Sequence, residues 1–330
     1  MSNAIGLLHA FVLDGRGGAQ PLDWDGVARW SPDDGVLWLA LDYNFPDAAD
    51  WLAHRSGIDP LVRDALLDVD PRPRAIAHGE NLMLIVRGIN QNQGSNPDDM
   101  ISIRVWVEPR RIVMMRHRVS RSLEALAASV AAGHGPRDTG QLVAELVEHV
   151  VEHVVHRVDL LGDAIAGFED QLLSEARRDL RTLRAALADH RRRAIALRRF
   201  LAPQRDALAQ LAHLAQPWFD PSHRARVVEQ ADRLTRTVEE LDAARDRAGV
   251  TQEELASRLT EMTNQRLYVL SIITVIFVPL GFVCSLLGVN VGGVPYKDTD
   301  WAFWALCGLF ALGTALLLWI LRRKGWLGRR

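Results

Sequence analysis

Side chains of the kinds that bind transition metals recur at helical spacing between residues 145 and 156. They are Glu145, Glu148, His149, Glu152, His153 and His156. Steps of three or four residues place them within about 140° of arc on a helix. Imidazole and carboxylate suit zinc, and two histidines four residues apart can share one ion. The pattern indicates a metal site or a proton-sensitive site on this face. The alternative is the solvated face of an amphipathic helix.

A second set of polar and small side chains follows one face of an apolar run, roughly Leu267–Leu287. We define this set as the polar stripe; its members are Asn264, Leu267, Ser271, Thr274, Val278, Gly281 and Ser285. Small and hydroxyl side chains on one face indicate either a pore lining or close packing between helices. The run contains no carboxylate, so a cation passing it would stay largely hydrated. Leu267 and Val278, repeated around an axis, could form hydrophobic constrictions.

The stripe belongs to the first of two apolar runs, and the second is roughly Trp301–Leu321. Each run holds about 21 residues without Asp, Glu, Lys, Arg or His, and a helix of that length rises about 31 Å, the thickness of a hydrocarbon core. Five Arg or Lys residues follow the second run, whereas the loop at 288–300 contains only Lys297 among the basic residues. The pattern therefore predicts a transmembrane hairpin with an outward loop and both termini in the cytoplasm.

Composition and known motifs narrow the function further. The net charge of −2 over 330 residues gives no indication of a nucleic-acid partner. Nucleotide-binding glycine loops, HExxH and nucleophile-elbow motifs are absent from the sequence, so we expect no enzyme and no prosthetic group. The N-terminus lacks a signal-peptide pattern, so the first 260 residues or so are expected in the cytoplasm. Cys284 and Cys307 are expected to be buried as small apolar residues.

The remaining chain predicts an α+β organisation in three regions. Residues 1–120 alternate apolar runs with turn residues and read as an α/β domain. Strands are expected at 5–13, 36–41, 82–89, 101–107 and 111–116, and short helices at 46–56 and 59–69. Residues 121–266 show helical periodicity and form a stalk, with a kink or break expected at Pro203. Residues 267–330 hold the two spans, the loop and the basic tail.

The stalk ends in one long predicted helix, which begins at about residue 222 and enters the first span. Between Pro221 and Pro279 the sequence has no proline, and only Gly249 interrupts the pattern. A helix of that length is on the order of 100 Å long and needs partners to be stable. Because two spans cannot enclose a permeation path, a channel built from them must be an oligomer.

The first span resembles that of the CorA-type metal ion transporter family. The shared marks are Asn264 before the span, Ile276-Phe-Val-Pro-Leu280 at its middle, and a Gly-X-Asn tripeptide at its outer end, here Gly288-Val289-Asn290. The family's magnesium channels carry Gly-Met-Asn at the tripeptide. The Gly-Val-Asn variant, followed by Val291-Gly-Gly-Val-Pro295, resembles the zinc-transporting ZntB branch.

The resemblance implies a homopentameric funnel in the inner membrane, with the first spans lining the pore. It implies that Gly288, Val289 and Asn290 form an outer ring that captures a hydrated cation, in which Asn290 contributes a side-chain carbonyl. Zinc is the implied substrate, with proton coupling in some members. A magnesium, cobalt or nickel channel is the alternative, and a membrane-tethered cytosolic sensor without transport is the second alternative.

Overall fold

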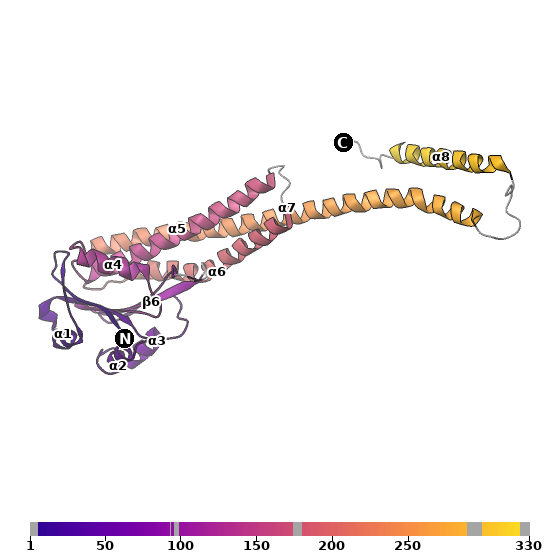
Figure 1. Cartoon of the computed structure of the whole chain (residues 1–330). Helices are drawn as coiled ribbons and strands as arrows, with labels where there is room; N and C mark the ends of the chain where they lie inside the picture. The colour runs from indigo at the N-terminus through magenta and orange to yellow at the C-terminus, as the bar shows by residue number, and fades with distance from the viewer. Residues whose placement is uncertain (1–5, 93, 96–98, 174–179, 289–298, 324–330) are drawn as a thin grey trace. The chain divides into compact units, whose positions relative to one another are not determined.

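The structure is a computed structural model that describes residues 6–92, 94–95, 99–173, 180–288 and 299–323. The chain divides into two compact units, Met1–Glu253 and Glu254–Arg330. The first unit contains a sheet with helices on both of its faces. The second contains the end of one long helix and a final helix. Figure 1 labels these elements along the chain.

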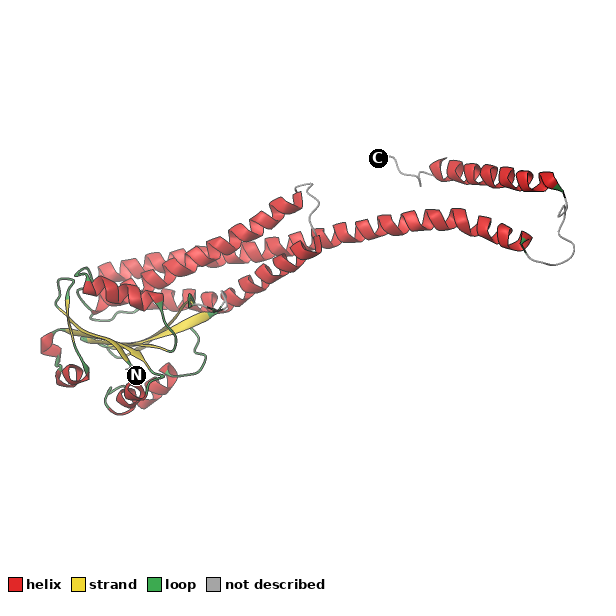
Figure 2. Ribbon diagram, in the orientation of Figure 1, coloured by secondary structure: helices red, strands yellow, loops and turns green. Residues whose placement is uncertain are grey.

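A seven-stranded sheet is the centre of the first unit (Figure 2). Its strands in spatial order are β2 (Ala19–Pro21), β1 (Leu7–Leu13), β3 (Val36–Asp42), β7 (Arg111–Arg116), β6 (Met100–Val107), β5 (Asn81–Ile89) and β4 (Arg74–His78). β3 and β7 run parallel, and every other neighbouring pair is antiparallel. The five predicted strands are confirmed, whereas β2 and β4 lacked a sufficiently long apolar pattern.

Three short helices cover one face of the sheet. They are α1 (Trp24–Arg29), α2 (Pro46–His54) and α3 (Pro60–Leu66). Their apolar residues join a buried cluster with alternate residues of the strands, including Leu39, Ile85 and Trp106. Asp23 and Asp59 each accept backbone N–H groups in the first turn of the following helix, which fixes where α1 and α3 begin.

The other face of the sheet carries the long helices (Figure 1). They are α4 (Arg121–Ala131), α5 (Thr139–Leu173) and α6 (Leu180–His213), with the first part of α7 (Pro221–Leu287) beside them. Because both faces are covered, β6 is buried almost throughout. The sequence of β6 alternates apolar residues with Ser102, Arg104 and Trp106, a pattern typical of a strand with one solvated face, but Arg104 is only 2% exposed.

Helix α7 packs on α5 and α6 within the first unit. Its buried residues step by three or four, the spacing of a coiled-coil seam; they are Val227, Ala231, Leu234, Val238, Leu241, Ala244 and Ala248. Arg198 of α6 donates to Asp242 over 2.6 Å, and Thr251 donates to Glu169 of α5 over 3.2 Å. The long predicted helix therefore has partners in its own chain.

Of the kink or break expected at Pro203, the break does not occur. Helix α6 continues through it to His213. The residues that follow Pro203, among them Gln204, Ala207 and Leu208, are buried where α6 meets β4 and β5. This packing offsets the cost of about 3 kcal/mol that an internal proline imposes on an isolated helix.

Candidate functional site

The candidate pore wall is the last third of α7. Two helices of the described chain are long and apolar enough to cross a membrane, α7 over its apolar end and α8 (Asp300–Arg323). Their large apolar side chains are exposed in the single chain, including Phe277 at 65% and Trp304 at 73%. Such exposure requires lipid or other subunits around them.

One face of α7 is turned toward α8 across a cleft. Ile272, Ile276, Leu280 and Val283 repeat at helical spacing and are less exposed than their neighbours. A cleft of about 300 Å³ lies between the helices at this level, and Ile276, Leu280 and Val283 line it from α7 while Phe310, Gly313, Thr314 and Leu317 line it from α8. Pro279 also lines this cleft, so the helix position that lacks an N–H lies on the α8 side.

The polar stripe lies on the opposite face of α7. At 100° per residue, Thr274, Val278 and Ser285 lie roughly 160° from the residues that face α8. Leu267 is 55% exposed and Val278 is 61% exposed. A Cβ atom built at Gly281 would meet nothing within 4 Å. Among the described residues, this face of α7 is therefore exposed and turned away from α8.

The hydroxyl groups of the stripe are arranged to present oxygen atoms outward. Ser271 donates to the Leu267 carbonyl and Thr274 donates to the Leu270 carbonyl, each over 2.9 Å. The single hydroxyl proton is used within the helix in each case, which leaves the oxygen lone pairs for another group. This arrangement suits contact with the water shell of a cation better than contact with an anion.

The outer tripeptide is only partly within the described residues. The Gly288 N–H donates to the Cys284 carbonyl over 3.0 Å and so completes the last turn of α7. Val289 and Asn290 lie outside the described residues, as does the predicted loop as far as Asp298. The predicted ring therefore stays a prediction. Cys284 and Cys307 were expected to be buried, but both are exposed and unpaired in the chain.

The Glu/His face of α5 is divided among different neighbours. Glu148 accepts two hydrogen bonds from Arg226 of α7, and Glu145 accepts one from Gln141. His153 lies 3.4 Å from the Ser122 hydroxyl of α4, and Glu152 and His156 are exposed. The described part of the chain contains no group of three His, Cys, Asp or Glu side chains that could hold a metal ion.

Arg226 is a neighbour of the Glu/His face that the sequence could not indicate. It is separated from Glu148 by 78 positions, and the local pattern around it is that of an ordinary charged helix. The pairing follows from the packing of α7 along α5. It places a fixed positive charge where a metal bound between Glu145 and Glu148 would lie.

Comparison with known proteins gives a consistent result over the whole chain. The family model described as "CorA-like Mg2+ transporter protein" matches residues 33–323. The chain is 37% identical to the divalent cation transporter CmaX of Pseudomonas aeruginosa, with 98% of this chain and 97% of the relative covered. It is 32% identical to the zinc transport protein ZntB of Yersinia pseudotuberculosis, with 97% and 96% covered.

The fold agrees with these matches. The structure of full-length CmaX superposes on this chain with a TM-score of 0.83 at 34% identity, covering 98% of this chain and 99% of that one. The similarity therefore includes the sheet, the long helices and both apolar helices. The relatives named by these matches are transporters rather than enzymes.

Proposed function

The chain belongs to the CorA-like Mg2+ transporter family, and from this premise we propose that it moves divalent cations across a membrane through a pore lined by α7. The observation that carries the proposal is the position of the polar stripe. It faces away from α8, is exposed in the described part of the chain, and presents hydroxyl oxygens from Ser271 and Thr274. A hydrated cation can be passed along such a surface without dedicated ligands.

The proposed pore requires several copies of the chain. Two apolar helices cannot surround a path, so the stripes of several copies must face a common axis. We propose a homopentamer, the arrangement that the resemblance of the first span implies. In it α7 forms the inner ring, and α8, packed on the opposite face of α7, forms the outer ring against lipid. Leu267 and Val278 then form apolar rings that restrict hydration of the pore.

We propose zinc as the first substrate. The support is the tripeptide Gly288-Val289-Asn290, which differs from the Gly-Met-Asn of magnesium channels, and the similarity to a relative named as a zinc transport protein. Val289 has no polar atom, so selection must come from backbone carbonyls and from the Asn290 side chain. The second relative is named only for divalent cations, and a magnesium, cobalt or nickel channel is the alternative.

We propose that the protein lies in the inner membrane with both termini in the cytoplasm. Arg322 and Arg323 close α8, and the Arg323 guanidinium lies 5.3 Å from the Trp319 ring centroid. Basic residues remain on the cytoplasmic side, and tryptophan favours the interface. Trp301, at the other end of α8, is 59% exposed and marks the outer interface.

Zinc flux into liposomes tests the proposal. The purified full chain is reconstituted, its oligomeric mass is measured, and an enclosed zinc-sensitive dye reports entry, with and without a pH gradient. Zinc entry above that of empty liposomes is expected, and a faster rate with an inward proton gradient would show coupling. Competition by excess magnesium, with little zinc entry, would favour the magnesium alternative. Absence of any flux from intact oligomers would favour the sensor alternative and refute transport.

Asn290→Ala tests the outer ring. If the Asn290 carbonyl helps to replace water around the ion, flux should fall at least tenfold while the oligomeric mass stays unchanged. Cys307→Ala, on the exposed face of α8, is the matched control and should leave the flux unchanged. Wild-type flux in Asn290→Ala would exclude a role for this side chain in capture.

A further inference from the structure

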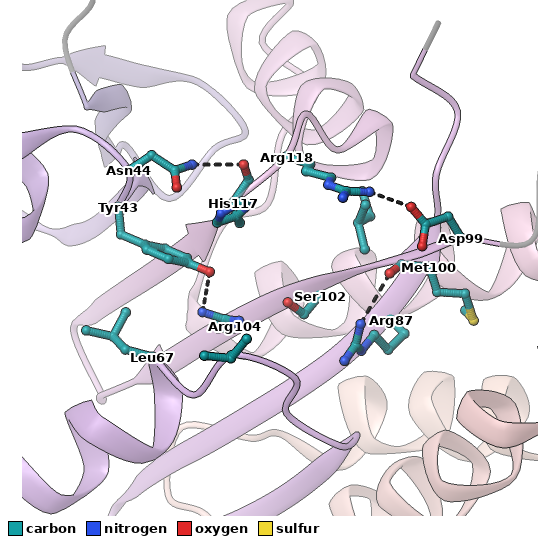
Figure 3. A pocket seen from close by; sticks show the side chains of 12 residues that line it. Tyr43, Asn44, Leu67, Arg87, Asp99, Met100, Ser102, Arg104, His117 and Arg118 are labelled. Atoms are coloured by element: carbon teal, nitrogen blue, oxygen red, sulfur yellow. Dashed lines mark hydrogen bonds and ion pairs between the residues drawn. The ribbon is translucent and has the colours of Figure 1, made fainter. Parts of the chain in front are cut away.

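A basic pocket opens in the first unit, on the α2–α3 face of the sheet and far along the chain from the spans. Its volume is about 440 Å³, within the range of small-molecule sites. Figure 3 shows its lining. The side chains that define it are Tyr43, Asn44, Arg87, Ser102, Arg104 and Arg118. We call it the arginine pocket.

Arg104 of β6 forms the floor of this pocket. It is 2% exposed, and its guanidinium donates to the Tyr43 hydroxyl and to the Asp68 carbonyl, the latter over 2.8 Å. Its Nε atom is buried and has no hydrogen-bond partner. Among the described residues no carboxylate lies within ion-pair distance of it. A buried charge without a counterion is costly and rarely kept unless something neutralises it.

Arg87 of β5 adds a second positive charge to the same floor. The strand register pairs Arg87 with Ser102 and Ile85 with Arg104, so the two arginines are diagonal neighbours on one face. Figure 3 shows Ser102 between them. Burial first, and then the nearby Arg87 charge, lower the pKa of Arg104, while interactions with Tyr43 and Asp68 act in the opposite direction. An anion bound beside Ser102 would relieve both unfavourable effects.

The Arg87 side chain is held in place by an ion pair, two backbone carbonyls and an aromatic ring. It pairs with Asp70, donates to the Met100 and Pro71 carbonyls, and lies 4.5 Å from the Phe200 ring centroid. Its Nε is also buried without a partner. The orientation of the guanidinium is thus fixed before any ligand arrives, which reduces the entropic cost of binding.

Two further side chains with N–H donors, Arg118 and Asn44, lie at the rim of the arginine pocket. Arg118 crosses the opening and pairs with Asp99, which is the sole carboxylate among the described lining residues. Asn44 donates its amide to the His117 carbonyl over 2.9 Å and holds that turn beside the pocket. The exposed Arg118 can turn from Asp99 to a ligand at little cost, because surface pairs contribute about 0–1 kcal/mol.

From these contacts we propose that the arginine pocket binds the phosphoryl group of a small soluble metabolite. Guanidinium groups match phosphate oxygens in a fork geometry, and the Ser102 hydroxyl adds a donor between them. The lining is unsuited to a metal cation, since its charged groups are mainly arginines. The volume leaves room beyond the phosphoryl group for a sugar or base against Leu67 and Val69.

Calorimetric titration of the full chain in detergent tests this proposal, with inorganic phosphate and AMP as probes at constant ionic strength. One binding event per chain is expected. Binding of both probes with similar affinity would identify free phosphate as sufficient, whereas tighter binding of AMP would identify a phosphorylated nucleoside. No heat from either probe at millimolar concentration, or equally tight binding of citrate, would overturn the proposal.

Three variants locate the binding. Arg104→Met should weaken binding of the tighter-binding probe at least tenfold, since it removes the positive charge at the floor of the arginine pocket. Arg116→Met is the matched control, because Arg116 is also a buried strand arginine but pairs with Glu124 on the other face of the sheet. The affinity of this variant for the same probe should stay within twofold of the wild-type value. If Arg104→Met does not fold, the exposed Arg118→Ser should still weaken binding about fivefold. Unchanged affinity in both pocket variants would overturn the assignment.

Discussion

Arg226 links α7 to the Glu/His face of α5 and can be tested as a pair with Glu148. Its Nε and Nη2 donate to the two Glu148 oxygens over 2.7 and 2.6 Å, and Nη2 lies 3.9 Å from Glu145 Oε1. The hydrogen bond to Glu148 raises the pKa of Arg226 more than burial lowers it. A raised basic pKa stabilises the fold at every pH below the unfolded value, which includes all ordinary assay conditions.

The structure sets the magnitude of this coupling. The Arg226 and Glu148 side chains are 35% and 31% exposed. Their pair is therefore intermediate between surface ion pairs, which contribute about 0.2–1 kcal/mol, and buried ion pairs, whose disruption costs about 3–5 kcal/mol. We expect a coupling of about 1–2 kcal/mol. For a unit of this size that corresponds to roughly 2–8 °C in Tm.

A double-mutant cycle measures it. Arg226→Met, Glu148→Gln and the double variant are compared with the wild-type chain by thermal unfolding in detergent at fixed salt and pH. Each single variant should lower Tm, and the double variant should cost little more than either single one. Tm losses that add within about 1 °C would refute the inferred coupling.

The same variant tests the predicted metal face. Arg226→Met leaves Glu145 and Glu148 without their cation, so zinc should raise the Tm of this variant and have little effect on the wild-type chain. Adding Glu148→Gln should remove the zinc effect. An equal rise in the wild-type chain would mean that zinc binds this protein without displacing Arg226.

Three further predictions concern the two spans and Asp47 of α2. Thr274→Val keeps the shape but removes a stripe hydroxyl and should lower zinc flux severalfold, whereas Thr314→Val, in the cleft between α7 and α8, should not. A Cβ atom built at Gly281 meets nothing within 4 Å, and Gly281→Leu should block flux or break the oligomer. A Cβ atom built at Gly308 also meets nothing within 4 Å, but Gly308→Leu should do neither, and mass measurement separates the outcomes. The pKa of Asp47 lies below its usual value, because burial, which raises it, is outweighed by hydrogen bonds from the Trp24 indole N–H and from backbone N–H groups. The ionised Asp47 therefore stabilises the fold above about pH 4, and this stabilisation is lost as the pH falls through the lowered pKa. Asp47→Asn should reduce Tm at neutral pH and make Tm depend less on pH in the acid range.

The sequence was sufficient where the pattern was long and local. The apolar runs, the helix from about residue 222 and the strands at 36–41 and 82–89 were each visible as an uninterrupted pattern. It was insufficient where a partner distant in the chain decides the outcome. β4 has few apolar residues of its own and forms because it pairs with β5. Pro203 is tolerated because α6 packs on the sheet.

The candidate sites divide in the same way. Periodicity identified the polar stripe but could not say which face of α7 meets α8. The Glu/His pattern was visible, but the Arg226 that neutralises part of it comes from another helix. Arg104 lies in a strand whose apolar and polar residues alternate, which is typical of one solvated face, yet α2 and α3 cover that face. These two helices are short, and their sequences do not indicate what they pack against.

The positions within the stripe also bear on whether it faces a lumen or a neighbouring helix. At 100° per residue, Thr274, Val278 and Ser285 lie within about 20° of the stripe's centre, while Ser271 and Gly281 lie about 40° to either side. In a ring of helices the centre of the inner face meets the axis, and its edges meet the two neighbouring helices. Small side chains at the edges allow the close approach that helix packing in a membrane requires. The two explanations of the stripe are therefore compatible, because one ring of α7 helices needs both kinds of contact.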